Sequence, residues 1–276
     1  MKRVDNELKF PLKGKYTAMI APSFIVDFYY PEIIYILKKL GFNKIVELTF
    51  GAKIINREYH KILADSKELK IATVCPGVVE FIKQKAPQYS KNLIQIDSPM
   101  IAMSKVCKKI YPKNKIVFIS PCHYKKEEAK KSKFVNHVID YKELKKIIET
   151  ENIKVTNKEQ IQFDKFYNEY TRIYPLAGGL SKTAHLKGII SKKEIKVIDG
   201  INNIIKFLEK PNKKIKFLDC NFCTGGCIGG PCINSPEKLR KRKKRVIRYL
   251  KQSEKEDIPK ARQGLIKKAQ GISFKT

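Results

Sequence analysis

The stretch Asp219-Cys-Asn-Phe-Cys-Thr-Gly-Gly-Cys-Ile-Gly-Gly-Pro-Cys232 follows an apolar run, Lys214–Leu218, that has the length and composition of a buried β-strand. It is too rich in cysteine and glycine for an ordinary core segment. Glycines leave no side chain between the backbone and a bound group, so we expect the N–H groups of Gly225, Gly226, Gly229 and Gly230 to reach the sulfur atoms of a bound cluster. The stretch therefore predicts a metal or cluster site at the end of a strand.

Three other chemically useful side chains lie where a strand-like run ends. They are Cys75 after Lys70–Val74, Cys122 after Lys115–Ser120, and Ser23 after Tyr16–Ala21. In parallel α/β sheets, binding sites form beyond the carboxyl ends of the strands. We therefore expect Cys75, Cys122, Cys223 and Cys227 to meet at one site, because four thiolates are what an iron–sulfur cubane needs.

Strand-like and helical segments alternate along the chain. Lys44–Phe50 is expected to be a strand, and Pro31–Leu40 has apolar residues at helical spacing before Gly41. Such alternation predicts βαβ units, a parallel sheet and the α/β fold class. The turn Tyr174-Pro-Leu-Ala-Gly-Gly179 has the composition of a loop that approaches a ligand closely, so Tyr174 is a candidate binding residue.

Composition limits the compartment and the partners. No apolar run approaches the roughly 18 residues of a membrane span, and the N-terminus has no signal-peptide core. We expect a cytoplasmic protein whose 7 cysteines are reduced and serve better as metal ligands than as disulfides. The net charge of +31 comes from lysines spread over the whole chain, which makes nucleic acid an unlikely partner.

The exception to this even spread is the segment 237–276. It has 15 Lys and Arg against 4 Asp and Glu, a net charge of +11, and includes Arg240–Arg245. Apolar residues at Leu239, Val246, Ile247 and Leu250 predict a helix on the body of the protein, with its basic side chains facing water. The basic residues of this segment are either a helix face exposed to water or a docking surface for an acidic partner, and the sequence leaves both interpretations open.

Simpler interpretations of the cysteines remain open. A lone cysteine at a strand end is more often a small core residue, and Cys107 in a helical stretch is predicted to be structural. Cys220, Cys223, Cys227 and Cys232 are an alternative four-thiolate zinc site. Their spacing is not that of paired zinc knuckles, and Pro231 stiffens the approach of Cys232. Iron–sulfur binding is therefore favoured over zinc.

Three motifs in order resemble the catalytic domain of iron-only ([FeFe]) hydrogenases. Ala72-Thr-Val-Cys-Pro76 is similar to the family's Thr-Ser-Cys-Cys-Pro, and Ser120-Pro-Cys-His-Tyr-Lys-Lys-Glu-Glu128 is similar to Met-Pro-Cys-x-x-Lys-x-x-Glu. Asp219–Cys227 is similar to Glu-x-Met-x-Cys-x-x-Gly-Cys. Ala21-Pro-Ser23 and Phe50-Gly-Ala52 also resemble family segments, so the resemblance runs from about residue 15 to about residue 250.

The resemblance implies two α/β lobes with mainly parallel sheets, flanked by helices, with the cluster in the cleft between them. We expect a body over 1–236, with lobes near 15–110 and 111–236, and a basic helical tail over 237–276. The resemblance implies a [4Fe–4S] cluster on Cys75, Cys122, Cys223 and Cys227. It also implies a two-iron subsite with CO, cyanide and dithiolate ligands, bridged by Cys227. Lys125 would bond a cyanide, and Ala21 and Ser23 would line the pocket.

The chain departs from the family along the proton route. Val74 stands where the family has its proton-delivering cysteine, and valine carries no exchangeable proton. The family's two carboxylates become Tyr59 and Ile62, and the serine between them becomes Ile94. The methionines that pack on the two-iron subsite become Ser120 and Asn221.

These departures leave more than one function open. We expect an iron–sulfur protein that senses redox state or a gas, or transfers electrons. The alternatives are a divergent minimal hydrogenase and a cluster-assembly factor. The implied partners are an electron carrier such as ferredoxin or a sensory protein, with hydrogenase maturation proteins if the two-iron subsite is present. The 276 residues contain no ferredoxin-like cysteine motif, so no accessory cluster is expected within them.

Overall fold

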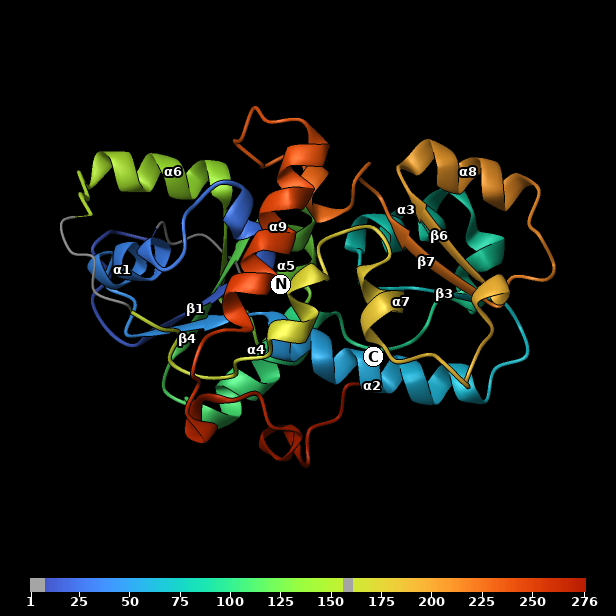
Figure 1. Ribbon diagram of the computed structural model, residues 1–276, viewed down its shortest axis with the longest axis horizontal. Coiled ribbons are helices and arrows are strands. Elements are labelled where there is room, and N and C mark those ends of the chain that lie inside the picture. Colours follow the sequence, from blue (N-terminus) through green and yellow to red (C-terminus); the bar gives the residue numbers. More distant parts are fainter. Residues whose placement is uncertain (1–7, 156–160) are drawn as a thin grey trace.

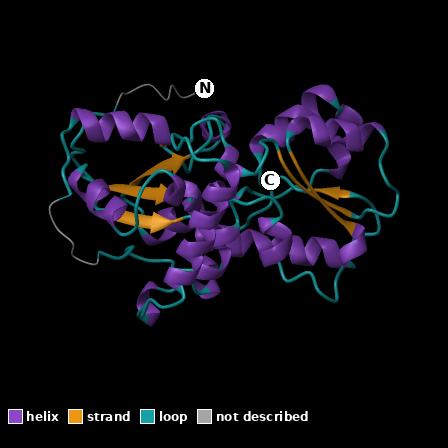
Figure 2. Ribbon diagram, turned by 45° about the horizontal axis from the view of Figure 1, so that its top comes forward, coloured by secondary structure: helices purple, strands orange, loops and turns teal. Residues whose placement is uncertain are grey.

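The computed structural model describes residues 8–155 and 161–276. It contains two parallel sheets, one in each of two lobes, with helices around and between them (Figures 1 and 2). The expected fold class, two α/β lobes with parallel sheets flanked by helices, is confirmed. No helix in the described ranges has both the length and the apolar character needed to cross a membrane.

The four-stranded sheet forms the first lobe. Its order is β2 (Lys44–Glu47), β1 (Tyr16–Ile20), β4 (Lys115–Ser120) and β5 (His137–Asp140), all parallel. Alternate residues of β1 point to opposite faces, because side chains alternate along a strand. Ala18 and Ile20 pack in the core under α1 (Glu32–Lys39) and α6 (Tyr141–Thr150). Met19 packs in the other core, with α2 (Thr49–Ala64) and α4 (Pro99–Ile110).

The three-stranded sheet forms the second lobe. Its order is β3 (Lys70–Ile71), β7 (Phe217–Asn221) and β6 (Ile195–Asp199), again parallel. The side chains of Leu218 and Cys220 pack in a core with α3 (Pro76–Lys85) and α8 (Ile201–Glu209). The alternate residues, Phe217 and Asp219, are turned toward α2 and α7 (Gly179–Thr183). The remaining α-helices are α5 (Tyr124–Lys130) and α9 (Leu239–Ser253).

The lobes do not follow the expected division at residue 110. Lys70 and Ile71 of β3 pair with Phe217 and Leu218, whereas β4 returns to pair with β1. Each sheet is therefore built from strands that lie on both sides of residue 110 in the sequence. The division into 15–110 and 111–236 is wrong because the chain passes to the second lobe after β2, returns to the first lobe for β4, and passes again to the second lobe after β5.

Several strand boundaries also differ from the expected ones. β2 ends at Glu47 and α2 begins at Thr49, so the expected strand Lys44–Phe50 covers a strand and the first turn of a helix. β3 has only two residues, because the chain leaves the sheet before Cys75. β7 begins and ends three residues later than Lys214–Leu218, which brings Asp219 and Cys220 into the sheet.

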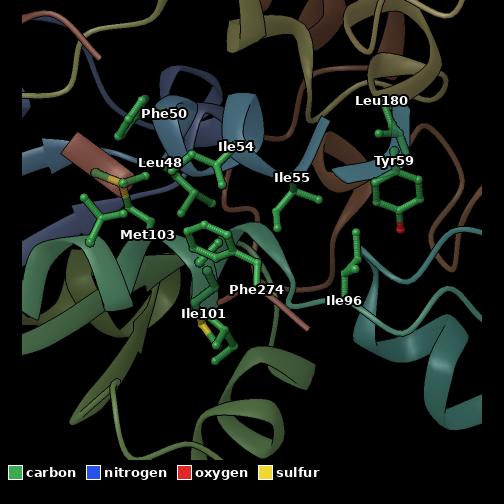
Figure 3. Packing of buried hydrophobic residues seen from close by; sticks show 14 of the residues in the cluster. Leu48, Phe50, Ile54, Ile55, Tyr59, Ile96, Ile101, Met103, Leu180 and Phe274 are labelled. Carbon is green, nitrogen blue, oxygen red and sulfur yellow. The ribbon is translucent and has the colours of Figure 1, made fainter. Parts of the chain in front are cut away.

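Helix α2 joins the two lobes through their shared core. Leu48, Phe50 and Ile54 pack near the first sheet, and Tyr59 contacts Phe217 of the second sheet with ring centroids 5.8 Å apart. Figure 3 labels four residues of α2 and its N-cap, Leu48, Phe50, Ile54 and Tyr59, together with Phe274 of the C-terminal segment. The chain that crosses from lobe to lobe is thus held by one continuous apolar cluster.

The basic segment 237–276 is helical over α9, and two short 3₁₀ turns follow at Lys260–Arg262 and Ile266–Ala269. α9 lies between the two lobes (Figure 1), and Val246 and Tyr249 are buried in the first lobe's core. The last residues return to the body, where the Phe274 carbonyl accepts a bond of 2.8 Å from the Asp97 N–H. Much of this segment is therefore part of the folded body.

Candidate metal centre

Three segments bring the cysteines to one place. Cys75 directly precedes α3, Cys122 lies two residues before α5, and Cys223 follows β7. The rings of Tyr124 and Phe222 lie 5.2 Å apart, and a Cβ added at Gly77 would be 3.1 Å from both rings. The residues beside the three cysteines therefore pack directly on one another. The expectation that these cysteines meet at one site rests on this contact as well as on the sequence pattern.

The Cys223–Cys232 loop is held by two turns from elsewhere in the chain. The Cys227 N–H donates to the Pro175 carbonyl at 2.8 Å, and the Cys232 N–H donates to the Pro121 carbonyl at 3.2 Å. A Cβ added at Gly226 would lie 2.6 Å from the Pro175 oxygen, and one at Gly230 would lie 2.7 Å from the Pro121 oxygen. These positions require glycine because backbone passes so close to backbone.

The expected role of the glycine N–H groups is not what the structure shows. The N–H groups of Gly226, Gly229 and Gly230 donate to the carbonyls of Cys223, Gly226 and Cys227, and that of Gly225 donates to the Asp199 carboxylate. They already have protein acceptors, because the loop folds into tight turns. The glycines therefore shape the loop rather than leave four free donors for a cluster.

The thiols influence one another electrostatically. Burial, followed by the neighbouring Cys75, raises the pKa of both Cys122 and Cys223 to about 11. Burial also raises the pKa of Cys227, and Cys75, Cys122 and Cys223 add to this effect. Lys125 acts in the opposite direction on the pKa of Cys122 and Cys227. Without metal these thiols stay neutral at pH 7, so a strongly charged metal group is needed to hold them as thiolates.

The thiols are not placed around a single ion. One zinc ion, with Zn–S bonds of about 2.3 Å, draws its thiolates to within about 4 Å of one another. No three His, Cys, Asp or Glu residues of 8–155 and 161–276 are grouped closely enough to hold one metal ion. Cys220 is buried in the core under α3 and α8, on the face of β7 opposite Asp219. The alternative zinc site of Cys220, Cys223, Cys227 and Cys232 is therefore not assembled.

A cavity of about 90 Å³ lies beside Cys227. It gathers three of the four candidate ligands and all four candidate binding residues: Cys75, Cys122, Cys227, Ala21, Ser23, Lys125 and Tyr174. Cys223 does not line it but acts on the pKa of both Cys122 and Cys227. Val74, Ser120, Asn221 and Asp219 also line the cavity.

The polar groups of the cavity are held in defined directions. The Lys125 ammonium pairs with Glu128 at 2.6 Å and donates to the Ser98 hydroxyl at 3.2 Å. The Tyr141 hydroxyl donates to the Ala21 carbonyl at 3.0 Å, so the buried Ser23 hydroxyl, 2.8 Å away, donates to Tyr141. Ser23 therefore directs its proton away from the cavity and offers it only oxygen lone pairs.

Two polar groups of this cavity stand out, the expected Tyr174 and Asp219, which the sequence did not single out as a binding residue. The Tyr174 hydroxyl is buried and has no hydrogen-bond partner among the described residues. Asp219 is buried, and burial raises the pKa of its carboxyl although it accepts a 2.9 Å bond from the Ser181 N–H. Asp219 was visible four residues before Cys223, but its burial depends on β7 extending to Asn221.

No carboxylate or thiol stands at the four positions of the expected proton route, which are Tyr59, Ile62, Val74 and Ile94. The Thr73 N–H donates to the Tyr59 hydroxyl at 2.7 Å, and the Thr73 hydroxyl donates to the Ile94 carbonyl at 2.8 Å. Burial raises the pKa of Tyr59, so its hydroxyl stays protonated and bonded to Thr73. Val74 lines the cavity with an apolar side chain that has no exchangeable proton.

Comparison with known proteins places this chain in a family. A sequence model described as "Iron only hydrogenase large subunit, C-terminal domain" matches residues 14–231. The chain belongs to the iron-only hydrogenase family. It is 27% identical over 312 aligned residues to Iron hydrogenase 1 of Clostridium pasteurianum, covering 87% of this chain and 54% of that protein. The chain therefore spans about half the length of this iron-only hydrogenase.

Solved iron-only hydrogenase structures share the fold. A variant of the [FeFe]-hydrogenase HydA1 from Chlamydomonas reinhardtii superposes with a TM-score of 0.63 at 14% identity, over 95% of this chain and 88% of that chain. Another variant of the same enzyme, in an apo form, superposes with a TM-score of 0.66 at 16% identity, over 96% and 87%. Membership in the iron-only hydrogenase family implies an iron–sulfur cofactor. The neutral thiols, the adjoining cavity and the unpartnered Tyr174 hydroxyl fit such a group.

Proposed function

We propose that the chain holds a [4Fe–4S] cluster on Cys75, Cys122, Cys223 and Cys227, and uses it to sense redox state or a gas or to transfer electrons. Such a cluster supplies one-electron chemistry. The observation that carries the proposal is that the candidate ligands are present, whereas the acid–base residues of the proton route are not. Three of the ligands line a cavity together with Lys125, while Val74 and a Thr73-bound Tyr59 occupy the proton route.

Removal of two ligands should abolish cluster loading. Anaerobic reconstitution of the unchanged chain is expected to yield about four iron and four sulfide per chain, the composition of the cubane. The Cys223→Ala/Cys227→Ala variant should fall close to zero, because half of the ligands are lost. Iron and sulfide assays, with electron paramagnetic resonance of the reduced protein, measure this.

Cys107→Ala is the matched control, because Cys107 is buried in the core on α4 and should leave loading unchanged. Circular dichroism reports whether each variant is folded. Full loading of the double variant would refute the ligand set. Zinc recovered in place of iron from anaerobically purified protein would refute the cluster.

A minimal hydrogenase is the second candidate, and the cavity beside Cys227 favours it. That cavity adjoins the ligands, and Lys125 and the unpartnered Tyr174 hydroxyl line it. A two-iron subsite with CO and cyanide ligands would be held there by Cys227, with Lys125 as the nearest cation. After treatment with hydrogenase maturation proteins, infrared bands of CO and cyanide would support this candidate. Their absence from a cluster-loaded protein would leave the sensing or electron-transfer function.

We propose an acidic electron carrier, such as a ferredoxin, as the partner. The cluster loop is covered by an exposed apolar residue, because Leu239 is 36% exposed and lies against Gly225 and Gly229. The same helix and its N-cap carry exposed basic residues: Lys238, Arg240, Lys241, Lys243, Lys244 and Arg248. An apolar centre beside the cluster with a positive rim suits a partner of opposite charge.

Reversal of the positive charge on α9 should slow reduction of the cluster by the partner. Reduction of the cluster by an acidic ferredoxin is expected to slow about 10- to 100-fold at low salt when Arg240, Lys241, Lys243 and Lys244 become Glu, because complementary charge accelerates encounter. The difference should shrink as salt is raised. Stopped-flow absorbance measures the rate.

The control for this prediction carries the same charge change elsewhere. Lys38, Lys39, Lys145 and Lys146 lie on α1 and α6, which are on the opposite side of the molecule from α3 and β7 in Figure 1. Arg242 is left intact because its guanidinium donates to the carbonyls of Glu237, Ile228 and Ser235 and so holds α9 in place. A rate unaffected by both salt and the α9 changes would remove the docking surface.

A further inference from the structure

A second cavity, of about 550 Å³, lies between α2 and the segments 168–171 and 183–185. Cavities of about 300–1,000 Å³ hold small organic ligands. It shares no lining residue with the cavity beside Cys227. Its lining includes lysine, arginine and histidine but no Asp or Glu, so it favours an anionic ligand.

One face of α2 supplies the positive charge. Lys53, Arg57, His60 and Lys61 recur at the spacing that places side chains on one side of a helix. The opposite side of α2 is fixed in the core by Ile55. Lys61 is paired with Glu58, but Arg57 has neither an ion pair nor a hydrogen bond with any described residue. Its guanidinium is therefore available to a ligand.

A buried acceptor without a partner lies in the same cavity. Asn56 is 5% exposed, and its Nδ2 donates to the Thr183 hydroxyl at 2.8 Å. That hydroxyl donates onward to the Gly179 carbonyl at 2.8 Å, which fixes which end of the amide faces Thr183. The Asn56 Oδ1 atom is left with no partner among the described residues. A ligand that brings an N–H group to this oxygen would remove the cost of an unsatisfied acceptor.

The rim of the cavity has a flat aromatic wall. The rings of Tyr170 and His185 stack with centroids 5.0 Å apart and planes 10° apart. Tyr170 is 44% exposed, and its hydroxyl donates to the Lys182 carbonyl at 3.1 Å, which fixes the ring. His185 has a φ of 52°, a left-handed conformation that few residues other than glycine adopt. Strained residues of this kind concentrate at binding sites.

We propose that this cavity binds a purine nucleotide. The base stacks on the Tyr170–His185 wall, one of its N–H groups reaches Asn56, and the phosphates face Arg57 and Lys53. Lysine-rich surfaces are common in a chain with a net charge of +31. A plain basic surface, however, provides neither a concave site, nor an aromatic wall, nor a buried amide oxygen that needs a donor.

The test measures binding to the full-length chain by isothermal titration calorimetry. ATP and GTP are the nucleotide probes, and inorganic tripolyphosphate is the probe for charge alone. We expect at least one nucleotide to bind about tenfold more tightly than tripolyphosphate, because base–aromatic stacking adds to phosphate binding. Arg57→Glu should weaken the nucleotide and tripolyphosphate about tenfold or more. Tyr170→Ala should weaken only the nucleotide.

Lys146→Glu on α6 carries the same charge change as Arg57→Glu and should leave all three affinities unchanged. Circular dichroism confirms that each variant is folded. Equal affinity for tripolyphosphate and both nucleotides, with no effect of Tyr170→Ala, would overturn the proposal in favour of an adventitious anion surface. No nucleotide binding at about 1 mM would also overturn it. Because the two cavities share no lining residue, the titration is carried out on chain with and without the cluster, and nucleotide binding is expected in both.

Discussion

Hydrogen turnover by the matured protein is expected to be about 100- to 10,000-fold slower than in a hydrogenase that keeps the family's thiol and carboxylates along the proton route. General acid–base help of this size is lost when the positions of the family's proton route carry no group of suitable pKa. Here Val74 lines the cavity, and the Tyr59 hydroxyl is bonded to Thr73, with its pKa raised by burial. Gas chromatography of hydrogen evolved from a strong reductant measures the turnover.

Two controls separate proton supply from failed assembly. Infrared bands of CO and cyanide establish that the two-iron subsite was loaded, and stopped-flow reduction of the cluster establishes that electrons arrive. A protein that passes both controls but evolves hydrogen at an ordinary hydrogenase rate would contradict the prediction. Such a result would also require a proton donor outside the four positions of the proton route. The buried Asp219 carboxyl, which lines the cavity, would then be the first residue to test by substitution.

Loss of the buried arginine is expected to cost about 3–5 kcal/mol of unfolding free energy. Arg172 is 0% exposed, and its Nε atom lies 2.9 Å from Glu47, which also accepts a 3.0 Å bond from the Tyr249 hydroxyl. Its guanidinium lies 4.2 Å from the centre of the Tyr249 ring. Arg172→Met would leave the Glu47 carboxyl buried without its counter-charge. Urea unfolding followed by circular dichroism measures the loss.

The same variant should show a definite pH dependence. Burial already raises the pKa of Glu47 above its ordinary value despite Arg172, and removal of Arg172 raises it further. The folded variant then keeps a proton that the unfolded chain releases above about pH 4.5. The unfolding free energy of the variant should therefore fall as pH rises above that value. Substitution of both residues, Glu47→Leu/Arg172→Met, should recover most of the stability and remove this pH dependence.

An exposed ion pair is the control for this prediction. Lys131 and Glu80 lie 3.5 Å apart, and both side chains are well exposed. Lys131→Met should change stability by less than about 1 kcal/mol. A loss from Arg172→Met no larger than this, or one that does not vary with pH, would contradict the role assigned to the buried pair.

Short-range sequence pattern predicted which cysteines lie together better than it predicted the pairing of strands. Cysteines at strand ends and glycines in a tight loop are local signals, and the structure gathers Cys75, Cys122 and Cys227 around one cavity. The pairing of β3 with β7 was not predictable, because β3 contributes only Lys70 and Ile71. Two residues do not indicate which strand they pair with. Single-sequence patterns describe which face of a segment is apolar, and not which distant segment covers it.

The polar residues that the sequence analysis missed share one cause. Arg172 and Asp219 are types that are usually exposed, and their burial arises from distant elements. Arg172 is enclosed by Tyr249 of α9, and Asp219 by α7 through the Ser181 N–H. The glycine N–H groups were misjudged for a related reason, since their acceptors include Asp199 at the end of β6.

The interleaved sheets also determine when the site can exist during synthesis. At about 5–20 residues per second, the ribosome needs on the order of ten seconds to travel from β3 to β7. Throughout that interval the Cys75 segment has no strand to complete its sheet, and Cys223 and Cys227 have not been made. The three cysteine segments can meet only after Cys227 has been made, about 150 residues after Cys75. A cofactor held by all three segments could therefore be delivered only after that point, and until then Cys75 and Cys122 would be thiols without their remaining partners.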